Sequence, residues 1–501
     1  MRAELQEREV LAMYDVRGIQ NYIFKSNVAK EIVGASALVE KIIPEGIQEY
    51  IKTLNPKDRE HYMTEWKTDD AKAFLKDAAI EMQIMFIGGG NAYVLFRKGA
   101  ICQKVNRFLA RYILDRTYSL SLAVAVVEKT ENYSVDYAAI NEEMRKIKAG
   151  MPLNMPVGAM PFMAADAITG YPLTSKVKGE YFSTEAMLKR NAFPKQEDEK
   201  IFDNMVTEKG DSSTLAVFHI DGNSMGKRII KEMHGIAEYE KAIRTMRAIS
   251  ADISETFRKN VDQMKAYMNV LAPRIKKDTS HKLYREIIVA GDDITFVCNA
   301  RLAIPAVEYF LKHIGDTGEF SACGGIAFFN SHFPFSDAYQ VAEACCESAK
   351  KRAKKTECRG EDGKIGNFLD FQICTNINAA NLEAYRERYY ATGEESFIAR
   401  PYYISEKKDS CLNEKNDQYN IERLHIWEKY FHDMPRNKAK QFRDIIPMGE
   451  NEIQKELSFL KSRGYMQLEQ TGEYGIWYDA LEIMDWYMEE SENENQNTAL
   501  E

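Results

Sequence analysis

Hydrophobic residues along this chain gather in short runs and in long stripes of three- and four-residue spacing, and one order of runs occurs twice. Two apolar runs, Val10–Asp15 and Thr214–Asp221, each end in an acidic residue. We expect both to be buried β-strands with the carboxylate at the carboxyl end. Apolar stretches broken by glycine follow at 84–96 and 287–297, and each predicts a β-hairpin with a tight turn.

The later landmarks of the two copies also correspond. Strands are expected at 120–127 and 320–329, and helices at 136–148 and 337–355. Because four landmarks recur in one order at similar spacing, the chain is best explained by an internal duplication. Each copy predicts a ferredoxin-like (βαββαβ-type) palm, an antiparallel sheet with helices on one face. In the second copy, the apolar stripe of 239–271 predicts a core-facing helix that Pro273 stops.

The duplication predicts an α+β chain of several parts. These are a first palm at 1–150, a connector at 151–205, a second palm at 206–380, a mostly helical C-terminal domain at 381–487 and a disordered acidic tail at 488–501. The C-terminal domain carries Trp427, Tyr430, Trp477 and Trp486 in a charged helical context. These aromatic side chains are expected either in the core or on a docking surface for partner subunits.

Composition narrows the classes of protein. The 501 residues are 45% hydrophobic and 29% charged, which is typical of a folded globular chain. The net charge of −9 argues against a protein that coats nucleic acid, although a local basic groove stays open. No apolar run is long enough to cross a membrane, and the N-terminus is too charged for a signal peptide.

The eight cysteines bear on metal binding and on location. They form no CxxC pair, and none lies between Cys102 and Cys298. This spacing argues against a zinc ribbon and against a disulfide scaffold. We therefore expect no zinc and a cytoplasmic, reducing location.

Three acidic residues of the second copy are the strongest candidates for chemistry. Asp221 ends the first strand, and Asp292 and Asp293 occupy the hairpin turn, so the three carboxylates should meet at one sheet edge. Clustered carboxylates repel each other unless a cation compensates them. Oxygen ligands suit Mg²⁺, and two such ions can assist phosphoryl transfer. We expect a catalytic metal site here, and we expect the nearby His219 to be structural, on the opposite face of the sheet from Asp221.

The surroundings of these carboxylates predict a nucleotide. A glycine-containing strand-to-helix turn follows Asp221, and its N–H groups can receive a triphosphate. A glycine in the hairpin leaves room for a base or sugar, and lysines at the end of the last helix can reach phosphates. The expected nucleotide-binding residues are Gly222, Asn223, Ser224, Gly226, Gly291, Lys350, Lys351 and Lys354. The alternatives are a plain helix cap for the turn and a solvated helix end for the lysines.

The first copy lacks most of these groups. Gly90 and Asn91 stand where Asp292 and Asp293 stand in the second copy. Because Asp15 alone cannot hold two metal ions, we expect the first palm to be catalytically silent. Whether it binds a nucleotide stays open.

These motifs together resemble a known family, the large subunit of type III CRISPR effectors (the Cas-ten family). Residues 8–380 carry the resemblance, and the helical C-terminal part carries it more loosely. The segments similar to the family's second palm are Asp221–Gly226, Ala290–Asp293, Phe320–Ala327 and the helix 338–355. The segments similar to its first, inactive palm are Tyr14–Phe24 and Glu31–Leu38.

The resemblance implies a cyclase-like palm that uses ATP with Mg²⁺ or Mn²⁺ to make cyclic oligoadenylates, which are antiviral second messengers. It implies that Asp221, Asp292 and Asp293 hold two ions, and that the partners are guide-RNA effector subunits and RNA. This sequence has Ala290–Gly291 where the family has two glycines. Many relatives begin with an HD nuclease and carry zinc cysteines between the palms. We expect this chain to lack the nuclease, since its first palm strand begins near residue 10, and to lack the zinc site, since no cysteine lies between the palms.

Three functions are compatible with these residues. The first is a nucleotidyltransferase or cyclase that releases pyrophosphate from ATP. The second is a catalytically weak scaffold subunit of a ribonucleoprotein effector complex, whose palms bind nucleotide or RNA. The third is a diguanylate-type cyclase, which the palm plan also fits, although no sensory domain is evident.

Overall fold

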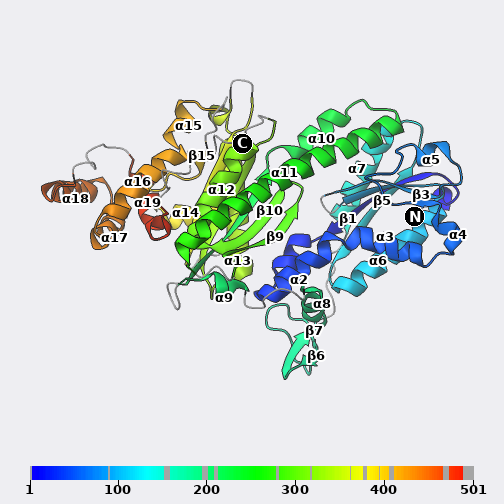
Figure 1. Cartoon of the computed structure of the whole chain (residues 1–501), viewed down its shortest axis with the longest axis horizontal. Helices are drawn as coiled ribbons and strands as arrows, with labels where there is room; N and C mark the ends of the chain where they lie inside the picture. The colour runs from blue at the N-terminus through cyan, green and yellow to red at the C-terminus, as the bar shows by residue number, and fades with distance from the viewer. Residues whose placement is uncertain are drawn as a thin grey trace. The chain divides into compact units, whose positions relative to one another are not determined.

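The computed structural model describes residues 3–88, 91–151, 158–194, 201–207, 213–277, 281–315, 319–360, 363–375, 381–393, 395–404, 411–465 and 473–488. The chain forms two compact units (Figure 1). The first unit contains residues 1–201, 224–258 and 287–292, and the second contains 202–223, 259–286 and 293–501. The predicted acidic tail lies outside the described residues from 489 onward, as does Gly90.

The first unit is built around a five-stranded sheet with the order β2-β3-β4-β1-β5. Its central strand β1 pairs antiparallel with β4 on one side and with β5 on the other. The strands are β1 (Val10–Arg17), β2 (Tyr62–Met63), β3 (Met82–Gly88), β4 (Asn91–Phe96) and β5 (Ser121–Glu128). The helices are α1 (Ile19–Phe24), α2 (Ala29–Glu40), α3 (Ile42–Lys52), α4 (Pro56–Arg59), α5 (Ala73–Lys76), α6 (Gly99–Thr117) and α7 (Tyr133–Gly150).

The connector after α7 forms a small subdomain of the first unit. It consists of the hairpin β6 (Leu173–Val177) and β7 (Glu180–Ser183), followed by α8 (Thr184–Ala192). A Cβ on Gly34 would lie 1.8 Å from the backbone oxygen of Lys189, so α2 and α8 pack with their backbones in direct contact. This contact attaches the connector to the first palm, and α9 (Ile201–Met205) leads on to the second.

The second unit contains a six-stranded sheet with the order β15-β12-β11-β8-β10-β9. Strand β11 pairs antiparallel with β8 and parallel with β12. The strands are β8 (Thr214–Gly222), β9 (Tyr284–Ala290), β10 (Asp293–Asn299), β11 (Ala322–Asn330), β12 (Asn367–Cys374) and β15 (Tyr402–Ile404). The accompanying helices are α10 (Met225–Met233), α11 (Tyr239–Ile275), α12 (Ala300–Ile314) and α13 (Phe335–Ala353).

The two sheets share one plan, which confirms the predicted duplication of a palm-type fold. In the first sheet, β1 lies between β4 and β5, and β3 flanks β4. In the second sheet, β8 lies between β10 and β11, and β9 flanks β10. Helices α6 and α12 follow the two hairpins, and helices α7 and α13 follow β5 and β11, so α6 and α7 correspond to α12 and α13.

The helices lie on both faces of the second sheet, so the expectation of one covered face was wrong. A Cβ on Gly324 would lie 2.5 Å from Val307 of α12, whereas a Cβ on Gly325 would lie 2.1 Å from the backbone oxygen of Ala342 in α13. Successive residues of a strand point to opposite faces, so α12 and α13 pack on opposite sides. The reason is that α13 follows the ferredoxin-like repeat and returns the chain to β12 across the other face.

The long helix α11 carries the predicted apolar stripe. Its residues at three- and four-residue spacing, including Ile243, Phe257 and Met268, are buried. The helix runs through Pro273 to Ile275, two residues beyond the predicted stop. Pro273 lies within the last turn, where the missing N–H costs little because few helical bonds follow it.

The C-terminal part is mostly helical, as predicted, and two of its four singled-out aromatic residues belong to the core, whereas Tyr430 and Trp486 are half-buried. Trp427 and Trp477 are buried and lie edge to face with their ring centroids 5.0 Å apart. They are therefore not the exposed docking surface that the sequence left open. The helices are α14 (Leu382–Tyr389), α15 (Glu414–Gln418), α16 (Ile421–Asp433), α17 (Arg436–Ile445), α18 (Glu450–Ser462) and α19 (Tyr474–Ile483), and β13 (Ala391–Thr392) pairs with β14 (Glu395–Ser396). None of the described helices is long and apolar enough to span a membrane.

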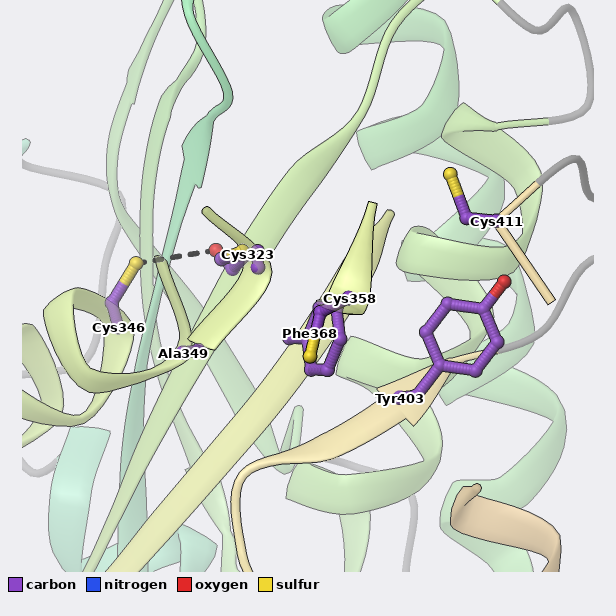
Figure 2. Close-up of a cluster of buried hydrophobic side chains, with 8 residues drawn as sticks. Cys323, Cys346, Ala349, Cys358, Phe368, Tyr403 and Cys411 are labelled. Atoms are coloured by element: carbon purple, nitrogen blue, oxygen red, sulfur yellow. Dashed lines mark hydrogen bonds between the residues drawn. The ribbon is translucent and has the colours of Figure 1, made fainter. Parts of the chain in front are cut away.

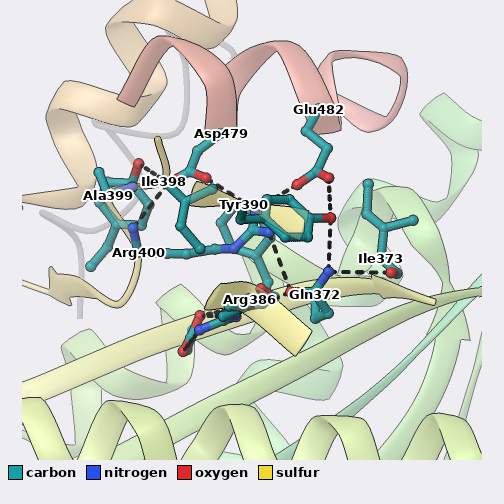
Figure 3. A network of polar contacts seen from close by, with 12 residues as sticks. Gln372, Ile373, Arg386, Tyr390, Ile398, Ala399, Arg400, Asp479 and Glu482 are labelled. Carbon is teal, nitrogen blue, oxygen red and sulfur yellow. Dashed lines mark hydrogen bonds and ion pairs between the residues drawn. The ribbon is translucent and has the colours of Figure 1, made fainter. Parts of the chain in front are cut away.

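A buried polar network joins the C-terminal helix α19 to the second sheet (Figure 3). Asp479 accepts hydrogen bonds from the backbone N–H groups of Ala399 and Arg400 and from the Tyr402 hydroxyl. The Arg400 guanidinium pairs with Asp479 at 3.0 Å and with Glu482 at 2.6 Å. Since β15 adds to the sheet and α19 holds the segment before it, the C-terminal part and the second palm pack as one core. The domain boundaries expected from the sequence stay a prediction.

A second buried contact joins α16 to α12. The His425 ring bonds Glu308 through Nε2 at 2.7 Å and Glu428 through Nδ1 at 2.8 Å. Burial opposes the charge of His425, but the two carboxylates outweigh it and raise its pKa well above the ordinary value. Each carboxylate therefore faces an imidazolium N–H.

This arrangement predicts that the protein loses stability as the pH becomes alkaline. Because the folded-state pKa is raised, the stabilisation by His425 is complete below the unfolded pKa of about 6.5 and fades as the pH rises through the folded value. His425→Gln should lower the unfolding free energy by about 2 kcal/mol at pH 6, and by less at pH 9. Urea unfolding at the two pH values measures this, with the exposed His332→Gln as control. If the difference in unfolding free energy between the wild type and His425→Gln is larger at pH 9 than at pH 6, the ion pairs of a charged His425 are contradicted.

Candidate functional site

The structure brings two of the three predicted acidic residues together. Asp221 lies near the end of β8, and Asp293 is the first residue of the neighbouring strand β10. Ile220 pairs with Ile294, so the next positions in this antiparallel register are Asp221 and Asp293. Both side chains are about one-third exposed. Two carboxylates therefore lie side by side at the rim of the sheet.

Helix α13 covers the face on which these carboxylates lie, and glycine makes its approach close. A Cβ on Gly325 would lie 2.1 Å from the carbonyl oxygen of Ala342 and 2.2 Å from the backbone nitrogen of Cys346. Any larger residue would push the helix away from β11. Gly325 stands opposite His219 in the register, so this contact sets the height of α13 above the site.

A cluster of buried thiols and aromatic rings fixes the C-terminal end of α13 (Figure 2). The Cys346 thiol donates to the backbone oxygen of Cys323, which stands opposite Asp221 on β11. Burial raises the pKa of both thiols, so they remain protonated packing groups. The cluster consists of Cys323, Cys346, Ala349, Ala353, Cys358, Phe368, Tyr403 and Cys411.

Lys350, one turn beyond Cys346, reaches the first carboxylate. Its ammonium group forms an ion pair with Asp221, and the lysine is 7% exposed. Burial disfavours the charge of Lys350, but the Asp221 carboxylate outweighs it and raises the lysine pKa. One predicted phosphate-binding lysine therefore lies in the site and neutralises one of its acids.

His219 also belongs to this site, and its expected placement was wrong. Positions 219 and 221 are two apart and therefore share a face of the strand. The His219 Nδ1 atom lies 3.1 Å from the Thr295 hydroxyl and 3.6 Å from Asp293. Burial lowers its pKa to about 4, so the ring is neutral at pH 7. A neutral ring beneath Asp293 adds no charge to the acidic rim.

Two further acids of α13 were not singled out from the sequence. Glu347 lies one turn before Lys350 on the helix, and Glu343 lies two turns before it. Burial raises the pKa of Glu343, and the carboxylates of Glu347 and Asp221 raise it further. The helical spacing of Glu343, Glu347 and Lys350 was the signal that could have placed all three on one face.

Some polar groups of the turn after Asp221 already form hydrogen bonds within the protein. The Asn223 backbone N–H donates to the Ser321 carbonyl, and its side-chain amide donates to Ser321 Oγ at 3.1 Å and to the Gly366 carbonyl at 3.3 Å. Ser224 has a left-handed backbone with φ of 60° and forms the N-cap of α10. Gly222 is buried, whereas Gly226 has open space where a Cβ would stand.

The remaining predicted residues lie at the hairpin and at the helix end. Gly291 and Asp292 form the turn before Asp293, and the positive φ of 66° at Gly291 favours glycine. Lys351 points elsewhere, since it pairs with Glu383 of α14 at 3.3 Å. Lys354 is the exposed C-cap of α13. The structure thus joins Asp221, Asp293 and Lys350 but not Lys351.

The described side chains of this site are of the kind that binds a hard divalent cation, but they are not arranged around one metal position. Asp221 and Asp293 offer carboxylate oxygens, which Mg²⁺ and Mn²⁺ prefer. Within the described part of the chain, no group of three or more His, Cys, Asp or Glu side chains is arranged around one metal position. The Lys350 ammonium contacts one oxygen of the Asp221 carboxylate, so a cation bound there would compete with Lys350.

The first palm retains a reduced version of the same site. Asp15 forms an ion pair with Lys148 of α7, and Asn91 stands opposite Asp15 in the register. Asn91 thus takes the position that Asp293 holds in the second palm. The amide adds no charge, so this position offers one carboxylate where the second palm offers two.

Comparison with known proteins supports this interpretation of the second palm. Residues 214–358 match the family model described as Cas10/Cmr2, second palm domain. The resemblance expected from the motifs is therefore confirmed: the chain carries a palm of the type III CRISPR large-subunit kind. None of the curated proteins matches the sequence.

Solved structures of the Csm1 protein resemble the chain more widely. The crystal structure of a Csm1–Csm4 cassette in complex with cA4 has a TM-score of 0.51 at 12% identity, covering 96% of this chain and 70% of that chain. The cassette in complex with AMPPNP gives a TM-score of 0.41 at 15% identity, covering 72% of this chain and 56% of that chain. At such low identity the likeness concerns the fold.

Proposed function

We propose that the second palm is a metal-dependent nucleotidyltransferase that converts ATP to cyclic oligoadenylate in type III CRISPR defence. The observation that carries this is the adjacent pair Asp221 and Asp293, at the rim of a sheet within residues that match the Cas10/Cmr2 second palm. The similar Csm1–Csm4 cassette was solved in complex with cA4, which supports an oligoadenylate product.

The reaction joins a ribose hydroxyl of one nucleotide to the α-phosphorus of ATP. The new P–O bond forms as the α–β phosphoanhydride breaks, pyrophosphate leaves, and the hydroxyl proton passes to solvent. Bound Mg²⁺ or Mn²⁺ would make the hydroxyl more acidic and neutralise the phosphates. Asp221, Asp292 and Asp293 would hold two such ions.

Other residues of the chain would bind and orient the triphosphate. The turn Gly222–Gly226 leads into α10, whose first N–H groups favour a phosphate. Lys350 supplies a compact positive charge on the same rim. Gly291 leaves space for the base or sugar, since nothing lies within 4 Å of the position that a Cβ would take.

A scaffold function is the alternative that a specific observation favours. Lys350 already neutralises Asp221, and the described carboxylates do not surround one metal position. A palm in this state would bind nucleotide or RNA without turning it over. In either case we propose that the chain works as a subunit of a guide-RNA effector complex, as Csm1 is paired with Csm4 in the similar structure.

Nucleotide and metal together should stabilise the protein. ATP with Mg²⁺ or Mn²⁺ at millimolar concentration should raise the melting temperature by several degrees, because a ligand bound only to the folded state stabilises it by mass action. Chelation with EDTA should abolish the shift, and Asp293→Asn should reduce it. An unchanged melting temperature at millimolar ATP and metal would count against nucleotide binding at this site.

A further inference from the structure

One ion pair occurs in both palms at equivalent positions. Asp15 of β1 pairs with Lys148 of α7, and Asp221 of β8 pairs with Lys350 of α13. Each lysine lies fifteen residues after the start of its helix, at Tyr133 and at Phe335 respectively. The pairing therefore belongs to the duplicated fold and is not a chance contact of one surface lysine.

The charges around the pair differ between the palms. Around Asp221, the second palm brings the carboxylates of Asp293, Glu343 and Glu347 close to Lys350. Clustered carboxylates repel one another, so this rim favours a divalent cation.

The first palm lacks these further carboxylates. The equivalent positions hold Asn91 on β4, and Asn141 and Arg145 on α7. Arg145 pairs with Glu142 on the same helix. The Asp15 side chain is 13% exposed and has Lys148 as its counter-ion, so its charge is balanced within the palm.

We propose that Lys350 is the resident counter-cation of Asp221, and that a divalent cation must displace it before the second palm can bind ATP productively. In this role Lys350 is a positioning residue. Displacement frees the Asp221 oxygens for the metal and delivers the ammonium to the incoming phosphates. The proposal rests on the proposed function, since it assigns an order of events at the same site.

This displacement couples the binding of the metal ion to the binding of the nucleotide. With no phosphate present, a metal ion competes with Lys350 for Asp221 and binds weakly. With ATP present, the displaced ammonium gains phosphate oxygens, so metal binding becomes tighter. By thermodynamic reciprocity, the metal must strengthen ATP binding by the same factor. The pair Asp15–Lys148 has no such second role because Asn91 supplies no further carboxylate.

The test is a titration of the full chain with Mn²⁺, with free Mn²⁺ followed by electron paramagnetic resonance. Lys350→Met should bind Mn²⁺ at least tenfold more tightly than the wild type when no nucleotide is present. Lys350→Arg keeps the charge and should match the wild type, as should Lys148→Met. The α,β-methylene analogue of ATP, whose α–β bridge cannot break in this reaction, should tighten Mn²⁺ binding to the wild type and have a smaller effect on Lys350→Met.

The other outcomes of this titration would overturn the role of Lys350, the metal-dependent function or the difference between the palms. If the wild type binds Mn²⁺ and Lys350→Met binds it no more tightly, the counter-cation role is overturned while the proposed function stands. If neither protein binds Mn²⁺ with or without the analogue, the metal-dependent function falls with it. If Lys148→Met gains as much affinity as Lys350→Met, the assigned difference between the palms is wrong. Circular dichroism melting of each variant separates these results from loss of the fold.

Discussion

Replacing Asp292 and Asp293 together with Asn should lower oligoadenylate formation by roughly a thousandfold or more. The amides keep size and hydrogen bonding but remove the negative charge that would hold the metal ions. Loss of the metals removes several kcal/mol of transition-state stabilisation. The fold should survive, since Asp293 lies among other carboxylates and its neutralisation relieves repulsion. Product quantified by mass spectrometry, with melting temperature beside it, provides the measurement.

Asp15→Asn is the matched control in the first palm. It removes the equivalent carboxylate, and its neighbour Asn91 already lacks charge. Turnover should stay within about tenfold of the wild type. If Asp15→Asn abolishes product as fully as the double variant, the active palm has been assigned wrongly. If neither change matters, any activity belongs to another site and the scaffold function becomes the better account.

Asp479→Ala should destabilise the second unit by about 3–5 kcal/mol. The fully buried Arg400 guanidinium would lose an ionic partner, and two backbone N–H groups and the Tyr402 hydroxyl would lose their acceptor. Breaking a buried pair by removing one partner is costly because the other charge stays buried. Denaturant unfolding measures the change. The exposed pair Arg436–Asp485 supplies the control, since Asp485→Ala should cost less than about 1 kcal/mol.

Equal losses of stability in Asp479→Ala and Asp485→Ala would show that Asp479 does not bind the C-terminal part to the palm.

The same network means that partner binding cannot be tested by deleting the C-terminal part. Removing the chain after residue 385 would delete β15 and α19, and with them the support of the second sheet. Such a deletion should unfold the palm, so a docking surface has to be mapped by substitutions at exposed residues.

The fold was largely predictable because the duplication repeats its landmarks. Apolar runs that end in Asp15 and Asp221 fix the central strands, and the glycine-broken stretches fix the hairpins. The face covered by α13 was not predictable from periodicity, because Gly324 and Gly325 are adjacent and only the packing shows which helix each one meets. The addition of β15 to the sheet likewise depends on a pairing far along the chain.

The site was predicted in part. Strand ends placed Asp221 and Asp293 together, since antiparallel neighbours bring those positions to one rim. The placement of His219 failed, although strand alternation puts it on the same face as Asp221. Lys351 lies away from the acids because adjacent helical residues point about 100° apart, so only one of Lys350 and Lys351 can face them.

Identification of the reaction products shows directly whether the second palm polymerises ATP. The purified full chain is incubated with Mn²⁺ and each nucleoside triphosphate in turn, and the products are identified by mass spectrometry. We expect pyrophosphate and cyclic oligoadenylates from ATP, and neither when EDTA is present or when Asp292 and Asp293 are both replaced. ATP binding shown by a metal-dependent melting shift, without any product from any nucleotide, would contradict this expectation.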